Sequence, residues 1–410
     1  MNGQFRSLIG QLPVAWIILN LEIITESQKK FYIVKVLKIH DTDDLDLPII
    51  RLHIITTYGI IIKNKPYILT FGGLIMPTLQ TAFTDFHDAI KLDDENETLC
   101  EKREILLKKL KENISENAAS YTTFNQGSYA MHTGIKPEDS DYDIDVGLKF
   151  DINKADYEDP IKVKKWVKDA LEGHTKSVKI RRSCVTVQYQ QNEEPLYHVD
   201  FAVYAANNDD LKLYIAKGKE FSEDDQKYWE VSDPQGLIEL ISNKYSGKDA
   251  EQFRRIIRYM KKWKIHNFSS SGNSAPTGIS LTILAYNLFS PNSTYDPFTN
   301  TSSFNDFNAL RNLVTSIKNQ FSFIFDSESN EFCYSIITNL PTEPYNNLFE
   351  KMSLKQQDTF HSKIIAMNEK LDEVEGKETL SEKCTLLAEL FGDDFPVLSE
   401  RSIVGSTESA

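Results

Sequence analysis

The stretch DYDIDVGL at residues 141–148 alternates acidic and apolar side chains. Successive side chains of a strand point to opposite faces, so the pattern predicts a strand with Asp143 and Asp145 on one face and apolar residues on the other. Two carboxylates that share a face repel each other unless a cation lies between them. Mg²⁺ takes hard oxygen ligands and leaves positions open for phosphate oxygens and water. The stretch therefore predicts a metal site on a strand.

A second strand pattern, YHVDFAVY at residues 197–204, contains a third acid. Asp200 lies between the apolar Val199 and Phe201, and a lone acid in an apolar strand needs a partner. If the two strands are neighbours, Asp200 joins the first two acids. The polar residues between Gln191 and Pro195 predict a turn before this strand.

The tripeptide Gln126-Gly127-Ser128 lies fifteen residues before the first metal acid. Glycine lets the backbone approach a phosphate closely, and the amides at the start of a following helix can bind its oxygens. Ser128 can add a hydroxyl donor. The tripeptide therefore predicts a phosphate-binding turn.

A predicted helix in the second half carries basic residues at helical spacing, in an otherwise acidic chain. Such a stripe suits a triphosphate. Its members are Arg254, Arg258, Lys261, Lys262 and Lys264.

Each of these features has an ordinary structural explanation when it is taken alone. An Asp-x-Asp in an acidic chain is usually a solvated strand edge, a Gly-Ser is usually a turn, and a basic stripe is usually solvated surface. Asp200 is less easily explained in this way, because its neighbours in the sequence are apolar. All four features in this order are difficult to produce by chance, so together they indicate phosphate and metal chemistry.

Composition limits the classes of function. The chain has 410 residues and a formal net charge of -14, which argues against a protein that coats long nucleic acid. The four cysteines form no CxxC pair, and the eight histidines form no HExxH motif, so no zinc site is predicted. The apolar stretch at residues 8–24 is interrupted by polar residues and falls short of the ~20 residues of a membrane span. We expect a cytoplasmic protein without a membrane segment.

The order of patterns, strands mixed with helices, predicts an α+β or α/β domain to about residue 215, followed by a mostly helical second half. Residues 1–75 are either a small β-rich appendage or translated upstream sequence, and we favour the second, with Met76 as the start. Residues 76–245 are expected to form the catalytic domain, 246–396 the helical domain and 397–410 a flexible tail. Apolar periodicity predicts helices that include residues 79–90, 106–114, 161–171 and 279–289. A helix capped by Asp249, with Gln252 completing a capping box, is expected to begin the helical domain.

The sequence resembles the nucleotidyltransferases related to polymerase beta, and among them the CD-NTases, the bacterial relatives of animal cyclic GMP-AMP synthase. The resemblance runs from about Met76 to Pro396. It is carried by QGSYAMHT at residues 126–133, by the two acidic strands, by FRRIIRYMKKWK at 253–264, by PTGISLT at 276–282 and by FGDDFP at 391–396. The combined set of motifs is specific, although each piece alone is not.

The resemblance implies an enzyme that makes cyclic di- or trinucleotides from nucleoside triphosphates, as signals that a separate effector protein reads in anti-phage defence (CBASS). It implies an α+β fold in which a mixed sheet with helices packs on a helical domain, with the active-site cleft between them. It also implies two Mg²⁺ ions, which Mn²⁺ can replace. Asp143 and Asp145 would bind both ions and Asp200 one of them. The donor nucleotide would be held by Gln126, Gly127 and Ser128, with Lys261 near its triphosphate and Thr277 as a weaker candidate.

Two features depart from the resembling family. Thr277 stands where a Ser is common, and residues 1–75 have no counterpart. The tail ends in Ala410, and in some systems of this family such a tail is conjugated to a target by ubiquitin-transfer-like enzymes. A frayed terminus is the simpler interpretation.

Other readings of the same acids stay open. One is a nucleotidyltransferase that makes linear oligonucleotides or modifies a small molecule or RNA. Another is a nucleotide sensor without catalysis, although a binder has no evident need for two metals. We expect the acceptor base to be chosen near Ser242 and Asn243.

Overall fold

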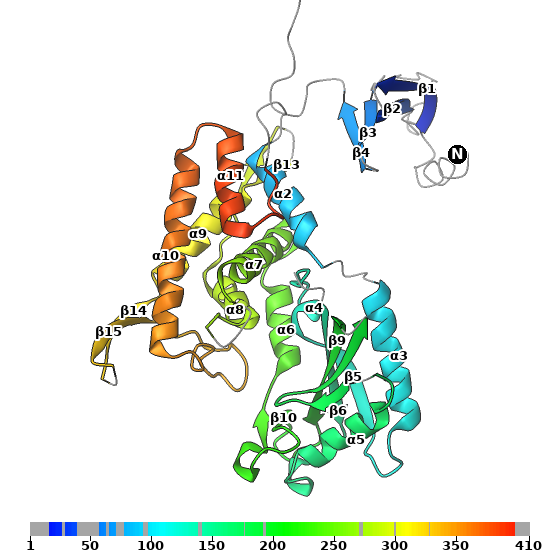
Figure 1. Cartoon of the computed structure of the whole chain (residues 1–410), viewed down its shortest axis with the longest axis vertical. Coiled ribbons are helices and arrows are strands. Elements are labelled where there is room, and N and C mark those ends of the chain that lie inside the picture. The colour runs from blue at the N-terminus through cyan, green and yellow to red at the C-terminus, as the bar shows by residue number, and fades with distance from the viewer. Residues whose placement is uncertain are drawn as a thin grey trace, which may run out of the picture. The chain divides into compact units, whose positions relative to one another are not determined.

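The chain forms two compact units, Met1–Pro77 and Thr78–Ala410, in a computed structural model (Figure 1). The structure describes residues 16–26, 29–38, 57–62, 65–70, 78–92, 97–137, 142–175, 177–191, 194–269, 274–298, 301–327 and 329–397. The tail with Ala410 therefore lies outside the described residues. No helix among the described residues is long and apolar enough to cross a membrane.

The first unit contains strands in its described residues. Strand β1 (Trp16–Glu26) pairs antiparallel with β2 (Lys29–Lys38), and β3 (Thr57–Ile62) pairs antiparallel with β4 (Lys65–Thr70). Strands are what the β-rich alternative for residues 1–75 expects. The site of translation start stays a prediction.

The second unit contains a mixed sheet of seven strands within its described residues. Its main path runs β11-β10-β9-β6-β5, and β8 pairs with β9 and with β7. The pair β6–β9 is parallel, whereas the other pairs are antiparallel. The strands are β5 (Tyr121–Asn125), β6 (Tyr142–Phe150), β7 (Ser177–Ile180), β8 (Val185–Gln191), β9 (Glu194–Ala205), β10 (Tyr214–Lys217) and β11 (Tyr228–Val231).

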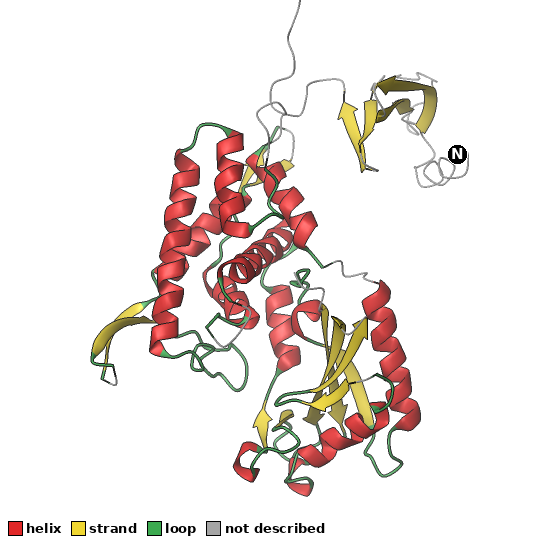
Figure 2. Cartoon of the chain, in the orientation of Figure 1, coloured by secondary structure: helices red, strands yellow, loops and turns green. Residues whose placement is uncertain are grey.

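Two helices pack beside this sheet (Figure 2), and we call the sheet with these helices the sheet domain. They are α3 (Glu97–Asn113) and α5 (Ile161–Leu171). Their buried Leu106 and Val163 share one apolar core with Ile144 of β6 and Val199 of β9. The alternating strand patterns form this core because apolar side chains at alternate positions, such as Ile144 and Val199, point to the helix-covered face.

The remaining helices form a second apolar core, which we call the helical domain. It includes α2 (Leu79–Ile90) and α6 (Pro234–Asn243), both within the range expected for the catalytic domain. In α2, Phe83 and Phe86 contact Tyr259, Phe391 and Phe395. The other helices are α7 (Gly247–Asn267), α8 (Gly278–Leu288), α9 (Asp306–Lys318), α10 (Leu354–Gly376) and α11 (Leu380–Phe391).

Two hairpins extend from the helical domain. The stretch before α9 forms β12 (Ser293–Asp296) and β13 (Thr301–Phe304). The second hairpin, β14 (Ser322–Asp326) and β15 (Glu331–Ser335), projects beside α10 (Figure 1). Short segments add α4 (Gly127–Ala130) and two 3-10 turns at Lys154–Asp156 and Asp224–Gln226.

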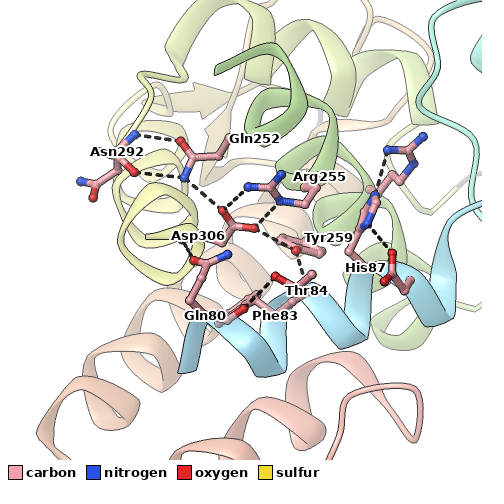
Figure 3. A network of polar contacts seen from close by, with 11 residues as sticks. Gln80, Phe83, Thr84, His87, Gln252, Arg255, Tyr259, Asn292 and Asp306 are labelled. Atoms are coloured by element: carbon pink, nitrogen blue, oxygen red, sulfur yellow. Dashed lines mark hydrogen bonds and ion pairs between the residues drawn. The ribbon is translucent and has the colours of Figure 1, made fainter. Parts of the chain in front are cut away.

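A buried polar network joins α2, α7 and α9 (Figure 3). Asp306, which has no exposed surface, accepts hydrogen bonds from Arg255, from Gln252 and from Tyr259. Its backbone amide donates to Gln80 Oε1 at 2.7 Å. The predicted capping box is therefore wrong. Helix α7 begins at Gly247 after Ser246, and Gln252 is buried because it binds Asp306.

Candidate active site

The register of β6 against β9 brings together the acids predicted from the sequence. Asp145 lies opposite Asp200, and Asp143 lies opposite His198. Because the intervening Ile144 and other alternate residues are buried in the sheet-domain core, these four polar side chains share the opposite face. The expectation that Asp200 joins the first two acids is therefore met by a parallel pair of neighbouring strands.

Three of these side chains present ligand atoms that lie close together. Carboxylate oxygens of Asp143 and Asp200 and a ring nitrogen of His198 all lie within 4.8 Å of one another. His198 Nε2 is 3.3 Å from Asp143 Oδ1. No role was predicted for His198 from the strand pattern at residues 197–204. Its signal was its position two residues before Asp200, which places both side chains on one face of the strand.

Asp200 is held by one protein partner and leaves one oxygen without any. The Cys184 thiol donates to Asp200 Oδ2 at 3.2 Å, and burial, followed by the charge of Asp200, raises the pKa of Cys184 to about 12. The thiol therefore keeps its proton for this hydrogen bond. Within the described residues, Asp200 Oδ1 is buried without a hydrogen-bond partner. A buried carboxylate oxygen without a partner is costly, so it fits a site for a cation.

The electrostatics of the acids also call for a cation. Burial raises the pKa of Asp145 to about 8, with the charges of Asp143 and Asp200 adding to the effect, while His198 and Lys261 oppose it. Three carboxylates on one face cannot all ionise at low cost without positive charge among them. The three carboxylates offer only oxygen atoms as ligands, which suits a hard divalent cation.

Gly127 is required by the backbone that approaches these acids. Its φ of +68° lies in the left-handed region, and a Cβ there would come 1.8 Å from Asp145 Oδ2. The preceding Gln126 is fixed by its amide, which donates to the Asp145 carbonyl at 3.1 Å, and by Tyr204, which donates to Gln126 Oε1 at 2.9 Å. The turn predicted to bind phosphate is therefore attached directly to the acidic strand.

A cavity of about 380 Å³ opens over this face. The sheet domain contributes Asp143 and Asp145 with the Gln126–Ser128 turn, and α6, α7 and α8 contribute the remaining walls. The lining residues are Gln126, Gly127, Ser128, Met131, Asp143, Asp145, Pro234, Leu237, Ile238, Lys261, Gly278, Ile279 and Thr282. The volume falls within the range of small-molecule sites, and six of the eight predicted site residues line it.

Lys261 reaches this cavity from a buried position on α7. Its ammonium donates to the Thr133 carbonyl at 2.9 Å and to the Thr133 hydroxyl at 3.0 Å. Burial lowers the pKa of Lys261 to about 7, with the charges of Arg258 and Lys264 acting in the same direction and Asp145 opposing them. Lys261 therefore carries, beside the acids, a positive charge that it loses readily by deprotonation.

The predicted basic stripe does not form one cationic surface. Arg258 is buried and donates to the Gly134 carbonyl at 3.0 Å, and Lys262 is buried in an ion pair with Asp394 at 2.7 Å. Lys264 lines a different cavity, of about 710 Å³. Helical spacing identified the helix correctly but not which basic side chains the helical domain itself uses.

Thr277 and the residues suggested for base choice lie away from the acids. Thr277 lines the 710 Å³ cavity, and its hydroxyl caps α8 by accepting from the Ser280 amide at 3.1 Å. Ile279 lines both cavities, so the two adjoin. Asn243 lines a third cavity, beside α6, of about 540 Å³, and Ser242 is exposed.

The part of the chain that contains the candidate site also matches known proteins. Residues 122–204 match the family described as cyclic GMP-AMP synthase DncV-like, nucleotidyltransferase domain. A curated cyclic GMP-AMP synthase from Escherichia albertii is 29% identical over 170 residues, which cover 39% of this chain and 35% of that protein. The matched segment thus spans about a third of that relative's length.

Solved structures share the fold over a longer stretch. The Vibrio cholerae DncV cyclic AMP-GMP synthase has a TM-score of 0.56 at 15% identity, covering 78% of this chain and 98% of its own. The Bradyrhizobium diazoefficiens CD-NTase CdnG in complex with GTP has a TM-score of 0.56 at 13% identity, covering 77% and 96%. CdnC of Escherichia coli MS115-1 with ATP has a TM-score of 0.54 at 15% identity, covering 77% of this chain and 98% of its own. These likenesses confirm the predicted fold.

Proposed function

We propose that this chain, whose residues 122–204 match the DncV-like nucleotidyltransferase family, condenses nucleoside triphosphates into a cyclic di- or trinucleotide and releases pyrophosphate. The single observation that carries the proposal is the parallel register of β6 and β9. It aligns Asp145 with Asp200 below a cavity that is also lined by the Gln126–Ser128 turn and, from α7, by Lys261. A binder would not need this cluster of mutually repelling acids.

In the proposed site, Asp143 and Asp145 hold two Mg²⁺ ions and Asp200 holds one of them. When bound, the ions supply charge stabilisation for the attacking and leaving oxygens of an in-line displacement. The buried oxygen of Asp200 supports this assignment, because it has free electron pairs and receives no hydrogen bond from the residues that the structure describes. Cys184 fixes the other oxygen and so orients the carboxylate toward the site.

The protein groups around the triphosphate have separate roles in this mechanism. Ser128 and the backbone at Gly127 contact the donor phosphates, and Lys261, tethered to Thr133, neutralises part of their charge. A ribose hydroxyl of the acceptor attacks the α-phosphorus, and Asp200 accepts the hydroxyl proton. The bond from the α-phosphorus to the bridging oxygen breaks, and pyrophosphate leaves with that oxygen. A second displacement in the same cavity closes the ring.

The wider role remains a prediction from the resemblance. It comprises signalling in anti-phage defence, an effector that reads the product, and conjugation at Ala410. A direct nucleotide contact for Thr277 is the weakest site assignment, because its hydroxyl already caps α8.

The proposal is tested by incubating the full-length chain with all four α-³²P-labelled ribonucleoside triphosphates and Mg²⁺, followed by phosphatase. We expect phosphatase-resistant label, whose mass distinguishes cyclic from linear products. Asp143→Asn should reduce the rate by at least about 10³-fold, since it removes a ligand to both metals while keeping the side-chain shape.

Asp169→Asn is the matched control, because Asp169 is an exposed acid on α5 of the same domain. It should leave the rate unchanged. Equal product from wild type and Asp143→Asn would overturn the metal assignment. A phosphatase-resistant linear product would keep the nucleotidyltransfer chemistry but overturn the cyclic product.

A further inference from the structure

Of the four side chains that β6 and β9 place together, Asp143, Asp145, His198 and Asp200, the three-acid pattern leaves His198 without a role. It occupies the corner of a two-by-two arrangement in which β6 provides Asp143 and Asp145 and β9 provides His198 and Asp200. Its side chain is 23% exposed, so it is neither a core residue nor a freely solvated one. A histidine at this position changes the chemistry of the donor set.

The ring nitrogen of His198 lies where a ligand would. Nε2 is 3.3 Å from Asp143 Oδ1, and both lie within 4.8 Å of an oxygen of Asp200. An ion with bonds of about 2.1 Å holds neighbouring ligands about 3.0 Å apart and opposite ligands about 4.2 Å apart. Small side-chain adjustments therefore suffice for all three groups to share one ion.

We propose that His198 is a direct ligand of one of the two metal ions and that the site consequently prefers Mn²⁺ to Mg²⁺. The inference rests on the proposed function, since it concerns the metals of that site. Neutral imidazole is a common ligand for first-row transition metals. Mg²⁺ favours oxygen ligands and gives up its water reluctantly, so a nitrogen donor benefits Mn²⁺ more.

The buried oxygen of Asp200 is the independent observation that a ligand belongs at this corner. Among the described residues it is the buried side-chain oxygen that lacks a hydrogen-bond partner, and it lies on the same strand and the same face as His198. A purely electrostatic role, in which His198 only balances the charge of Asp143, would leave this oxygen without a partner. A shared ion satisfies all three groups at once.

Pulsed EPR of the full-length chain with Mn²⁺ alone distinguishes the two roles. Direct coordination by imidazole produces a nitrogen modulation of the Mn²⁺ echo, which an ion held by carboxylates and water lacks. We expect this modulation in the wild type and its loss in His198→Gln. His174→Gln is the matched control, because His174 lies in the sheet domain and contacts Tyr189 instead of the acids; it should keep the modulation.

Competition between Mn²⁺ and Mg²⁺, followed by the EPR signal of free Mn²⁺, measures the preference. His198→Gln should weaken Mn²⁺ binding at least about tenfold and weaken Mg²⁺ binding much less. Equal losses for both ions, or bound Mn²⁺ without nitrogen modulation in the wild type, would overturn the inference. The proposed function would survive either result if product still formed with Mg²⁺, whereas a wild type that binds neither ion nor makes product would lose both.

Discussion

Two acidic sites in this chain, at Asp306 and at Asp145, differ in the groups that surround their carboxylates. Asp306 accepts four hydrogen bonds from the protein, two of them from Arg255 at 2.6 and 2.8 Å. Burial alone would raise the pKa of Asp306, but Arg255, Gln252 and Tyr259 together lower it below its ordinary value. Asp145 is surrounded by other acids, and burial and repulsion raise its pKa to about 8. A buried carboxylate that accepts hydrogen bonds from protein donors has a structural role. A carboxylate that faces other carboxylates is a candidate for binding a ligand.

The largest expected effect on stability comes from substituting Asp306. Asp306→Asn leaves Arg255 charged and partly buried without its counter-ion, so we expect a loss of about 3–5 kcal/mol in the free energy of unfolding. Chemical denaturation measures it. Asp372→Asn, which breaks the more exposed pair with Arg311 at 2.7 Å, should change stability by less than about 1 kcal/mol. Equal effects of the two variants would remove the structural role assigned to Asp306.

His87, at the edge of the same network (Figure 3), predicts a pH dependence of stability. Burial lowers its pKa to about 4, the charges of Arg258 and Arg255 act in the same direction, and Asp88 opposes them. Between about pH 6.5 and pH 4 the unfolded chain binds a proton that the native protein does not, so stability falls as pH decreases. The difference between the ordinary pKa of 6.5 and the lowered pKa of about 4 corresponds to at most about 3.4 kcal/mol.

His87→Gln isolates this contribution from the other groups that titrate in the same range. Denaturation from about pH 7.5 to about pH 5 should show a shallower decrease for the variant than for the wild type. His266→Gln, at an exposed position near the end of α7, should follow the wild type. Parallel curves for wild type and His87→Gln would mean that His87 has the same pKa in the native and unfolded states.

The sequence predicted those parts of the site that depend on local pattern. Alternation at residues 141–148 and 197–204 predicted both strands and the face of each acid. The contact between Asp143 and His198 depends on the parallel register, which is set by pairing over more than fifty residues of sequence. Gly127 was predicted to approach phosphate, whereas its closest neighbour in the fold is Asp145, which no local pattern indicates.

The interpretation of Gln252 failed for the same physical reason. Its spacing from Asp249 matched a capping box, but its amide instead donates to Asp306, fifty-four residues away. Likewise, helical spacing could not show that Lys262 forms an ion pair with Asp394 of the FGDDFP stretch at residues 391–396. Local periodicity reports which residues share a face, whereas the partner of a buried polar group is chosen by tertiary packing.

The smallest expected effect tests the acidic side of the comparison, and its sign is opposite to that of Asp306→Asn. Without metal, Asp145→Asn removes the carboxyl group whose ionisation burial and the neighbouring acids oppose, while keeping the side-chain shape. The free energy of unfolding should therefore rise by about 1–2 kcal/mol in EDTA at neutral pH. A divalent ion at a hundredfold excess over its dissociation constant should stabilise the wild type by about 2.7 kcal/mol and the variant by less. Asp169→Asn should respond as the wild type does. If Asp145→Asn lowered the stability of the metal-free protein, Asp145 would belong with Asp306 as a structural acid, and the cation would have to be sought among Asp143, His198 and Asp200 alone.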